Sequence, residues 1–159
     1  MTLTSRVRPK IGDVVEISTP QGLAYAHYTH KHDEPPCYGA LLRVLPGLHS
    51  ERPADFSSLV AHEPIFSVFF PLGAACNRRI VTVVAAEHVS ASSRAFPTFR
   101  SAFSNSGPWV LWDGQKEWRV HSLTSQQFKD FPPLGVINDT LLIDRILQGW
   151  RHEHHGVAA

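Results

Sequence analysis

The spacing of apolar residues changes near residue 120, and this change restricts the fold class more than any other feature. Before it, short segments rich in Val, Ile and aromatic residues alternate with turns that contain Pro, Gly or Asp, which is typical of β-strands. After it, Thr124 and Gln127 form a capping-box pattern, and Asn138 or Asp139 marks the start of a second helix. Strands followed by helices predict an α+β fold, with a curved, mostly antiparallel sheet, an SH3-like or partial-barrel N-terminal half and C-terminal helices.

Five segments are predicted as strands, and a hairpin follows them. The strands cover residues 12–17, 23–28, 38–45, 64–70 and 79–86, and the hairpin covers 109–120. The first two should pair through a turn, whereas 64–70 and 79–86, rich in β-branched and aromatic residues, should lie at the centre of the sheet. In the hairpin, Asp113-Gly114 marks the turn because both residue types tolerate a positive φ.

Two long segments show no regular pattern. Residues 48–63 are polar and allow at most one short helical turn, so we expect a loop there. Residues 90–108 mix Ser, Arg, Pro and Phe irregularly. Phe96, Phe99 and Phe103 should anchor them as a packed loop, since large aromatic side chains are usually buried.

Length and charge exclude several classes of protein. A chain of 159 residues with 43% apolar residues fits a single domain, 1–159, with flexible ends at about 1–9 and 152–159. The formal net charge of +1 gives no basic surplus for nucleic-acid binding. No apolar run approaches the ~20 residues that span a bilayer, and residues 1–10 lack the apolar core of a secretory signal. We expect a cytoplasmic monomer or homodimer with neither a nucleic-acid nor a membrane partner.

Motifs for nucleophilic or nucleotide chemistry are missing from the sequence. Neither a GxSxG turn nor a GxGxxG or GxxxxGK[ST] phosphate loop occurs. Cys37 and Cys76 show no CxxC spacing, so we interpret them as two reduced thiols that act as small core hydrophobes. The sequence therefore predicts no catalytic residue, no cofactor and no enzymatic activity.

Histidine clusters supply one alternative, a metal-dependent enzyme. His27, His30 and His32 lie close together, with Glu34 nearby, and transition metals favour imidazole with carboxylate. No HExxH motif or second ligand pair accompanies them, so a solvated polar segment is the simpler interpretation. The other cluster, in residues 152–155, is expected to belong to a frayed end.

Aromatic residues around the hairpin turn supply a binding hypothesis. Trp109, Trp112 and Trp118 flank the turn, and Trp112 and Trp118 are expected to form a cross-strand pair. They are either core residues or an exposed patch that anchors a partner. The acidic, proline-rich segment 33–36 is a candidate neighbour of such a patch. An SH3-like module that binds peptides in an aromatic groove is a further alternative.

Three N-terminal segments resemble the start of immunity protein family twenty-six. They are residues 10–17 (KIGDVVEI), 22–26 (GLAYA) and 38–44 (YGALLRV). Residues 112–114 (WDG), 118–120 (WRV), 123–124 (LT) and 134–139 (LGVIND) look like the later half of related small bacterial proteins. The resemblance implies an immunity protein of a polymorphic toxin system, which binds and blocks a cognate toxin domain and has no catalysis of its own. Immunity proteins against nucleases are often strongly acidic, whereas this chain is nearly neutral, so the toxin need not be a nuclease.

Residues on predicted loops and hairpin tips are the candidates for the binding surface. They are Tyr25, Asp33, Glu34, Trp112, Asp113, Lys116 and Trp118. Alanine at Trp112 and Trp118 is expected to weaken partner binding without unfolding the domain.

Overall fold

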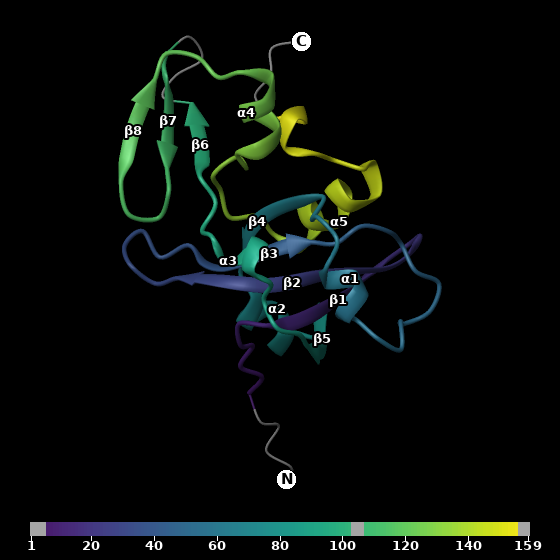
Figure 1. Ribbon diagram of the computed structural model, residues 1–159. Helices are drawn as coiled ribbons and strands as arrows, with labels where there is room; N and C mark the ends of the chain where they lie inside the picture. Colours follow the sequence, from purple (N-terminus) through teal and green to yellow (C-terminus); the bar gives the residue numbers. More distant parts are fainter. Residues whose placement is uncertain (1–5, 103–106, 156–159) are drawn as a thin grey trace.

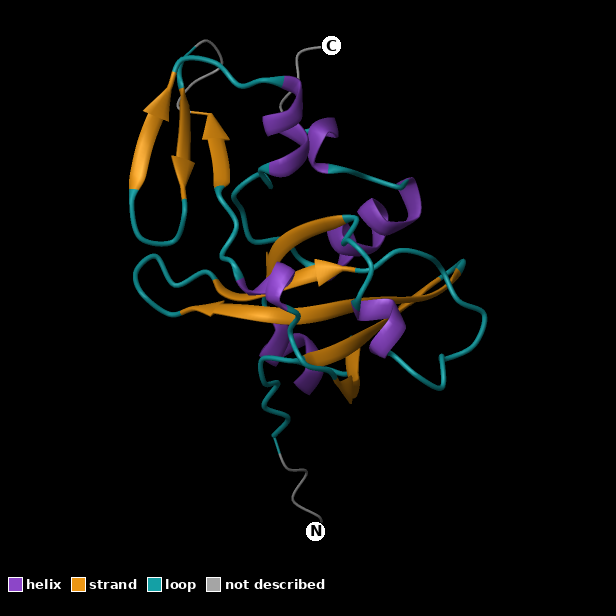
Figure 2. Cartoon of the chain, viewed as in Figure 1, coloured by secondary structure: helices purple, strands orange, loops and turns teal. Residues whose placement is uncertain are grey.

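The computed structural model describes residues 6–102 and 107–155 and shows an α+β fold, as predicted (Figures 1 and 2). A five-stranded antiparallel sheet contains β1 (Asp13–Thr19), β2 (Gly22–His32), β3 (Gly39–Val44), β4 (Phe66–Phe70) and β5 (Val81–Ala86). A three-stranded sheet contains β6 (Phe99–Ala102), β7 (Trp109–Trp112) and β8 (Glu117–Val120). The helices are α1 (Ser57–Val60), α2 (Leu72–Asn77), α3 (Ala91–Arg94), α4 (Ser125–Asp130), α5 (Asp139–Gln148) and the 3-10 helix η1 (His152–His154). Within the described ranges no helix is long and apolar enough to cross a membrane.

The large sheet has the strand order β4-β3-β2-β1-β5, so four strands form a meander and β5 returns to pair with β1. This is the strand order of an SH3-like partial barrel. The predicted first hairpin is confirmed, with Thr19 paired to Gly22 across the turn. The prediction that 64–70 and 79–86 lie at the centre is wrong, because β4 and β5 are the two edge strands. The apolar side chains of β4 and β5 suggested central positions. In the structure, helices cover much of their surface in place of flanking strands.

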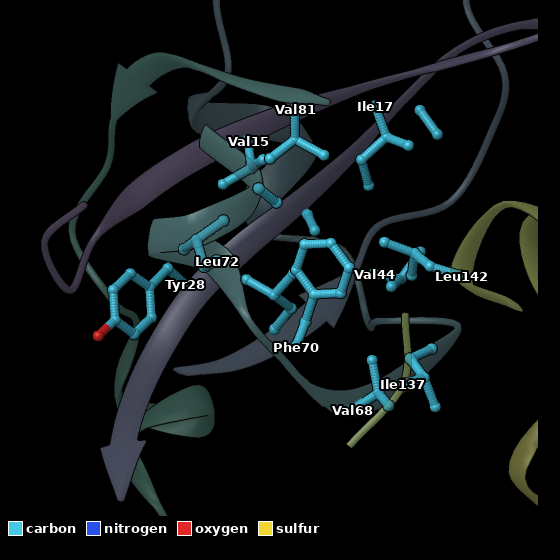
Figure 3. Packing of buried hydrophobic residues seen from close by; sticks show 14 of the residues in the cluster. Val15, Ile17, Tyr28, Val44, Val68, Phe70, Leu72, Val81, Ile137 and Leu142 are labelled. Atoms are coloured by element: carbon cyan, nitrogen blue, oxygen red, sulfur yellow. The ribbon is translucent and has the colours of Figure 1, made fainter. Parts of the chain in front are cut away.

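One face of the large sheet packs against α2 and α5 (Figure 3). Leu72 of α2 and Leu142 of α5 meet Val15, Tyr28 and Phe70 from the strands, and all five side chains are buried. Burying large apolar side chains in this way contributes roughly 1.5–3 kcal/mol each, so this cluster dominates the stability of the large sheet.

The two predicted helix starts are confirmed. Thr124 and Gln127 form a capping box at α4. The Asn138 side chain accepts a hydrogen bond from the Leu141 amide, 2.9 Å away, at the start of α5. Gly149 ends α5 in the left-handed conformation, with φ at +65°, which glycine adopts at little cost. These ends were predictable because each depends on residues only a few positions apart.

The opposite face of the large sheet joins the small sheet through an aromatic cluster. Phe69 of β4 stacks on Phe99 of β6, with ring centroids 5.0 Å apart, and both side chains are fully buried. The predicted packed loop over 90–108 is wrong in part, because α3 and β6 lie within it. Phe96 and Phe99 do anchor this segment as predicted, whereas Phe103 lies outside the described residues.

A buried arginine holds the segment that follows α5. Arg100 is 1% exposed and donates hydrogen bonds to the carbonyls of Phe131 (3.0 Å) and His155 (2.9 Å). It also donates to the carbonyls of Phe128 and His152. Residues 152–155, which the sequence predicts to fray, are thus bonded to β6 through Arg100.

His152 connects the same segment to the large sheet. Its Nε2 accepts a hydrogen bond from the Ser67 amide of β4 (2.9 Å), and its Nδ1 lies 3.0 Å from the Lys129 carbonyl. At the other end of the chain, the Val7 amide donates to the Asn77 side chain (2.8 Å). Part of the predicted flexible end 1–9 is thus bonded to α2.

Candidate functional site

Two exposed segments that are far apart in sequence lie side by side at one end of the molecule (Figure 1). They are the β2–β3 loop, residues 33–37, and the β7–β8 turn, residues 113–116. We call these segments together with Trp118 the tip surface. The residues at their bases bring them together: the Trp112 ring lies 4.8 Å from that of His32 and 5.3 Å from that of Tyr38. The residues that flank the acidic loop thus contact the base of the hairpin, and the predicted role of segment 33–36 beside an exposed aromatic patch stays a prediction.

Backbone bonding to Asp113 shapes the β7–β8 turn. Its carboxylate accepts hydrogen bonds from the amides of Lys116 (2.9 Å) and Gln115 (3.0 Å), and these two bonds lower the pKa of Asp113. Gly114 has φ at +94°, and a Cβ there would approach the Phe96 ring to 2.9 Å. The turn therefore requires glycine both for its conformation and for the ring that supports it.

The β2–β3 loop presents two carboxylates to solvent. Asp33 and Glu34 are both exposed, and Lys31 lies 3.6 Å from the Asp33 carboxylate. Cys37 is also exposed and donates its thiol hydrogen to the Asp33 carbonyl, so its predicted place in the core is wrong. Cys76 is buried as predicted, and burial raises the pKa of its thiol.

Trp112 belongs to the structural base of the tip surface. Besides His32 and Tyr38, its ring lies 5.4 Å from Phe96 and 5.7 Å from Phe99. The predicted pairing of Trp112 with Trp118 is wrong, because Trp112 pairs with Glu117 and Leu111 pairs with Trp118. Successive residues of a strand point to opposite faces, so the two tryptophans lie on opposite sides of the small sheet.

Truncation of Trp112 should therefore affect folding before it affects binding. We expect Trp112→Ala to lower the free energy of unfolding by about 3 kcal/mol, because large-to-small changes at well-packed aromatic sites cost that much. Urea unfolding followed by circular dichroism measures the change. A loss below about 0.5 kcal/mol, typical of a surface substitution, would place Trp112 outside the packed base.

Tyr25 does not border the tip surface, and its assignment to a binding surface is wrong. It is 1% exposed and packs edge to face on Phe56, with ring centroids 5.0 Å apart. Its hydroxyl donates to the Glu16 carboxylate (2.9 Å), and burial together with this bond raises the pKa of Tyr25 to about 12. Strand alternation identifies the residues that share a face but not whether that face is covered. Here both faces are covered.

The histidines of β2 do not converge on one point. His27 is buried, and its Nε2 lies 3.0 Å from the Glu87 carbonyl. The Nε2 of His30 lies 2.8 Å from the Arg94 carbonyl, and burial lowers the pKa of His30. The His32 ring packs on Trp112. Within residues 6–102 and 107–155, no group of three or more His, Cys, Asp or Glu side chains is placed to hold a metal ion. The alternative of a metal-dependent enzyme thus lacks a ligand set there.

A cleft of about 510 Å³ between the large sheet, α4 and η1 was not predicted from the sequence. Arg43 lines it, donating to the Ser93 and Ala95 carbonyls, both at 3.2 Å, while its buried Nε has no partner. Its charged lining consists of the cations Arg43, Lys129 and Arg151 and the carboxylates Glu63, Asp130 and Glu153, together with His152. Three cations and three carboxylates thus line the cleft in equal number. Its residues come from segments widely separated in sequence, and no local motif could have revealed it.

Comparison of this chain with protein-family models, with curated proteins and with solved structures gives no match. The resemblance to immunity protein family twenty-six stays a prediction that depends on the short motifs of the sequence.

Proposed function

We propose that this chain is a non-enzymatic protein-binding module that acts in the cytoplasm, as an immunity protein that neutralises a cognate bacterial toxin domain by direct binding. The observation that carries the proposal is the convergence of the β2–β3 loop and the β7–β8 turn into one exposed surface over a packed aromatic base. Exposed loops on a rigid scaffold are common positions for binding residues.

The tip surface has the properties that favour tight association. Its aromatic base and the Asp113 backbone bonds hold both segments in place before binding, which reduces the conformational entropy lost when a partner docks. Trp118 is partly exposed on β8, with the Lys116 ammonium 5.5 Å from its ring. Tryptophans with this accessibility are frequent energetic centres of interfaces. Asp33 and Glu34 supply exposed negative charge on the β2–β3 loop.

A two-stage binding experiment tests the proposal. The full chain and its Trp118→Ala variant are used in parallel to capture partners from a lysate of the native host, and stoichiometric partners are identified by mass spectrometry. The isolated partner domain is then titrated against each variant, and it is expressed with and without the chain to measure bacterial growth. We expect a single toxic domain that the chain neutralises, and an affinity for it that falls by about tenfold to a hundredfold in Trp118→Ala.

An exposed apolar residue outside the tip surface provides the control. Leu141 of α5 is 40% exposed, and Leu141→Ala should bind as the unmodified chain does. Equal affinity of all three proteins for the partner would remove the tip surface from the interface. A partner whose expression does not impair growth would contradict the immunity function.

An SH3-like peptide-binding module is the second candidate, and the strand order of the large sheet favours it. This function requires aromatic rings that face each other across an open groove. The rings of His32, Tyr38 and Trp112 instead contact one another. Several unrelated partners that share a short motif would support this candidate, whereas an immunity protein should bury an interface above ~1,000 Å² with one partner.

A further inference from the structure

Arg43 and Arg100 differ in how completely their guanidinium groups are bonded. Arg100 donates hydrogen bonds from all three of its guanidinium nitrogens to backbone carbonyls. Arg43 donates from Nη2 alone, to the carbonyls of Ser93 and Ala95, while its buried Nε has no partner. A buried donor without an acceptor costs free energy that a hydrogen bond would recover. Arg43 therefore keeps a donor that no described residue satisfies.

The positive charge of Arg43 also lacks a counter-ion. In the part of the chain that the structure describes, no ion pair includes this half-buried residue. Burial lowers the pKa of Arg43, whereas a paired carboxylate would raise it. Because a cation shielded from water loses part of its hydration, an anion that binds to it replaces interactions that the solvent no longer provides.

Arg43 lines the cleft between the large sheet, α4 and η1, whose volume of about 510 Å³ is in the range of small-molecule sites. Ser67 lies opposite Arg43 in the register of β3 and β4, so both side chains lie on the same face of the large sheet. Most of the uncharged lining is apolar and consists of Pro64, Ile65, Ala95, Phe96, Pro97 and Pro132. The cleft thus combines an incompletely bonded guanidinium with an apolar wall.

The other charged residues of the lining differ from Arg43 in exposure or in bonding. Glu153 is half-buried, and its carboxylate favours the charged form of Arg100. His152 uses both ring nitrogens in hydrogen bonds. The remaining four are exposed, so water screens their charges: Glu63, Lys129, Asp130 and Arg151. Arg43 is therefore the group of this lining best placed to attract a ligand.

We propose that the cleft binds a small molecule with one carboxylate and an apolar body, and that the carboxylate binds to Arg43. A guanidinium presents donors in a planar fork that matches the two oxygens of a carboxylate. The apolar body would contact the Phe96 ring and the prolines of the wall. One guanidinium suits a monoanion, whereas phosphate groups are commonly held by backbone amides at a glycine-rich loop, which the lining lacks.

This site is separate from the tip surface. None of the residues 33–37, 113–116 or Trp118 is among those that line the cleft. The proposal therefore does not depend on the immunity function, and each can fail without the other.

NMR titration of the full chain tests the proposal, with 3-phenylpropanoate as the probe and 3-phenylpropanamide as its uncharged match. We expect 3-phenylpropanoate to shift the backbone N–H signal of Ser67 and the Nε–H signal of Arg43. We expect 3-phenylpropanamide to bind at least about tenfold more weakly, because it lacks the charge that Arg43 recognises. Equal binding of the two probes, or no shift at these two residues, would overturn the proposal.

Variants of Arg43 separate recognition of the carboxylate from the shape of the cleft. Arg43→Met should weaken the binding of 3-phenylpropanoate by about tenfold to a hundredfold, because methionine fills similar space but donates no hydrogen bond. Arg43→Lys keeps a cation without the planar fork and should bind with intermediate affinity.

The matched control is Arg8, which is exposed and does not line the cleft, so Arg8→Met should bind as the unmodified chain does. Circular dichroism verifies that each variant is folded, and the comparison of the two probes on the unmodified chain does not depend on any variant. Equal affinity of folded Arg43→Met and the unmodified chain for 3-phenylpropanoate would overturn the role of Arg43.

Discussion

Arg100→Met is expected to lower the free energy of unfolding by about 4 kcal/mol, because it leaves several buried carbonyls without a donor. The guanidinium is 1% exposed and bonds to carbonyls in two separate segments, at Phe128 and Phe131 and at His152 and His155. Methionine fills much of the same volume but donates no hydrogen bond. Urea unfolding of the variant and of the unmodified chain measures the difference.

We expect that lysine at position 100 does not supply the stability that Arg100 provides. Burial lowers the pKa of Arg100 to about 10, so its charge persists at neutral pH. The ammonium of Arg100→Lys is compact and lacks the planar fork of donors that reaches both segments, so this variant should also be destabilised. Arg8 is exposed, and Arg8→Met should change stability by less than about 0.5 kcal/mol. A loss below about 1 kcal/mol in Arg100→Met would show that water replaces the guanidinium at these carbonyls.

The elements predicted correctly from the sequence depend on neighbouring residues. The hairpins around residues 20–21 and 113–116 and the caps at Thr124 and Asn138 each involve groups a few positions apart. The structural role of Arg100 could not be predicted in this way. Its carbonyl partners are 28 to 55 positions away in the chain, and the residues around it look irregular.

In the candidate site, too, the sequence predicts the features that depend on a local turn and not those that depend on distant packing. Asp33, Glu34 and Lys116 could be identified because charged residues in turns are usually exposed, and all three are exposed in the structure, whereas Asp113 is half-buried. Tyr25 was misassigned because alternation along β2 cannot show that the large sheet is covered on both faces. The packing that covers its second face, including the contact between Tyr25 and Phe56, joins residues far apart in the chain.

Acidification from pH 6.5 to about 4 is expected to destabilise the chain by about 3 kcal/mol through His152 alone. Burial lowers the pKa of His152 from 6.5 to about 4, and the nearby Arg100 charge acts in the same direction. The neutral ring donates from Nδ1 to the Lys129 carbonyl and accepts at Nε2 from the Ser67 amide. Between these two pH values the unfolded chain binds a proton that the folded chain excludes. The contribution of His152 to the free energy of unfolding is therefore fully present above pH 6.5. It declines as the pH falls, until the ring in the folded chain also becomes protonated.

Urea unfolding of His152→Gln between pH 7 and 5 tests this dependence. Burial also lowers the pKa values of His30 and His155, so part of the slope should remain in the variant. The lowered pKa values of Glu16, Asp55 and Asp113 act below about pH 4.5, outside this range. His62 is exposed, and His62→Gln controls for the loss of one imidazole. A slope in His152→Gln equal to that of the unmodified chain would show that His152 is protonated in the folded state without loss of its bond to Ser67.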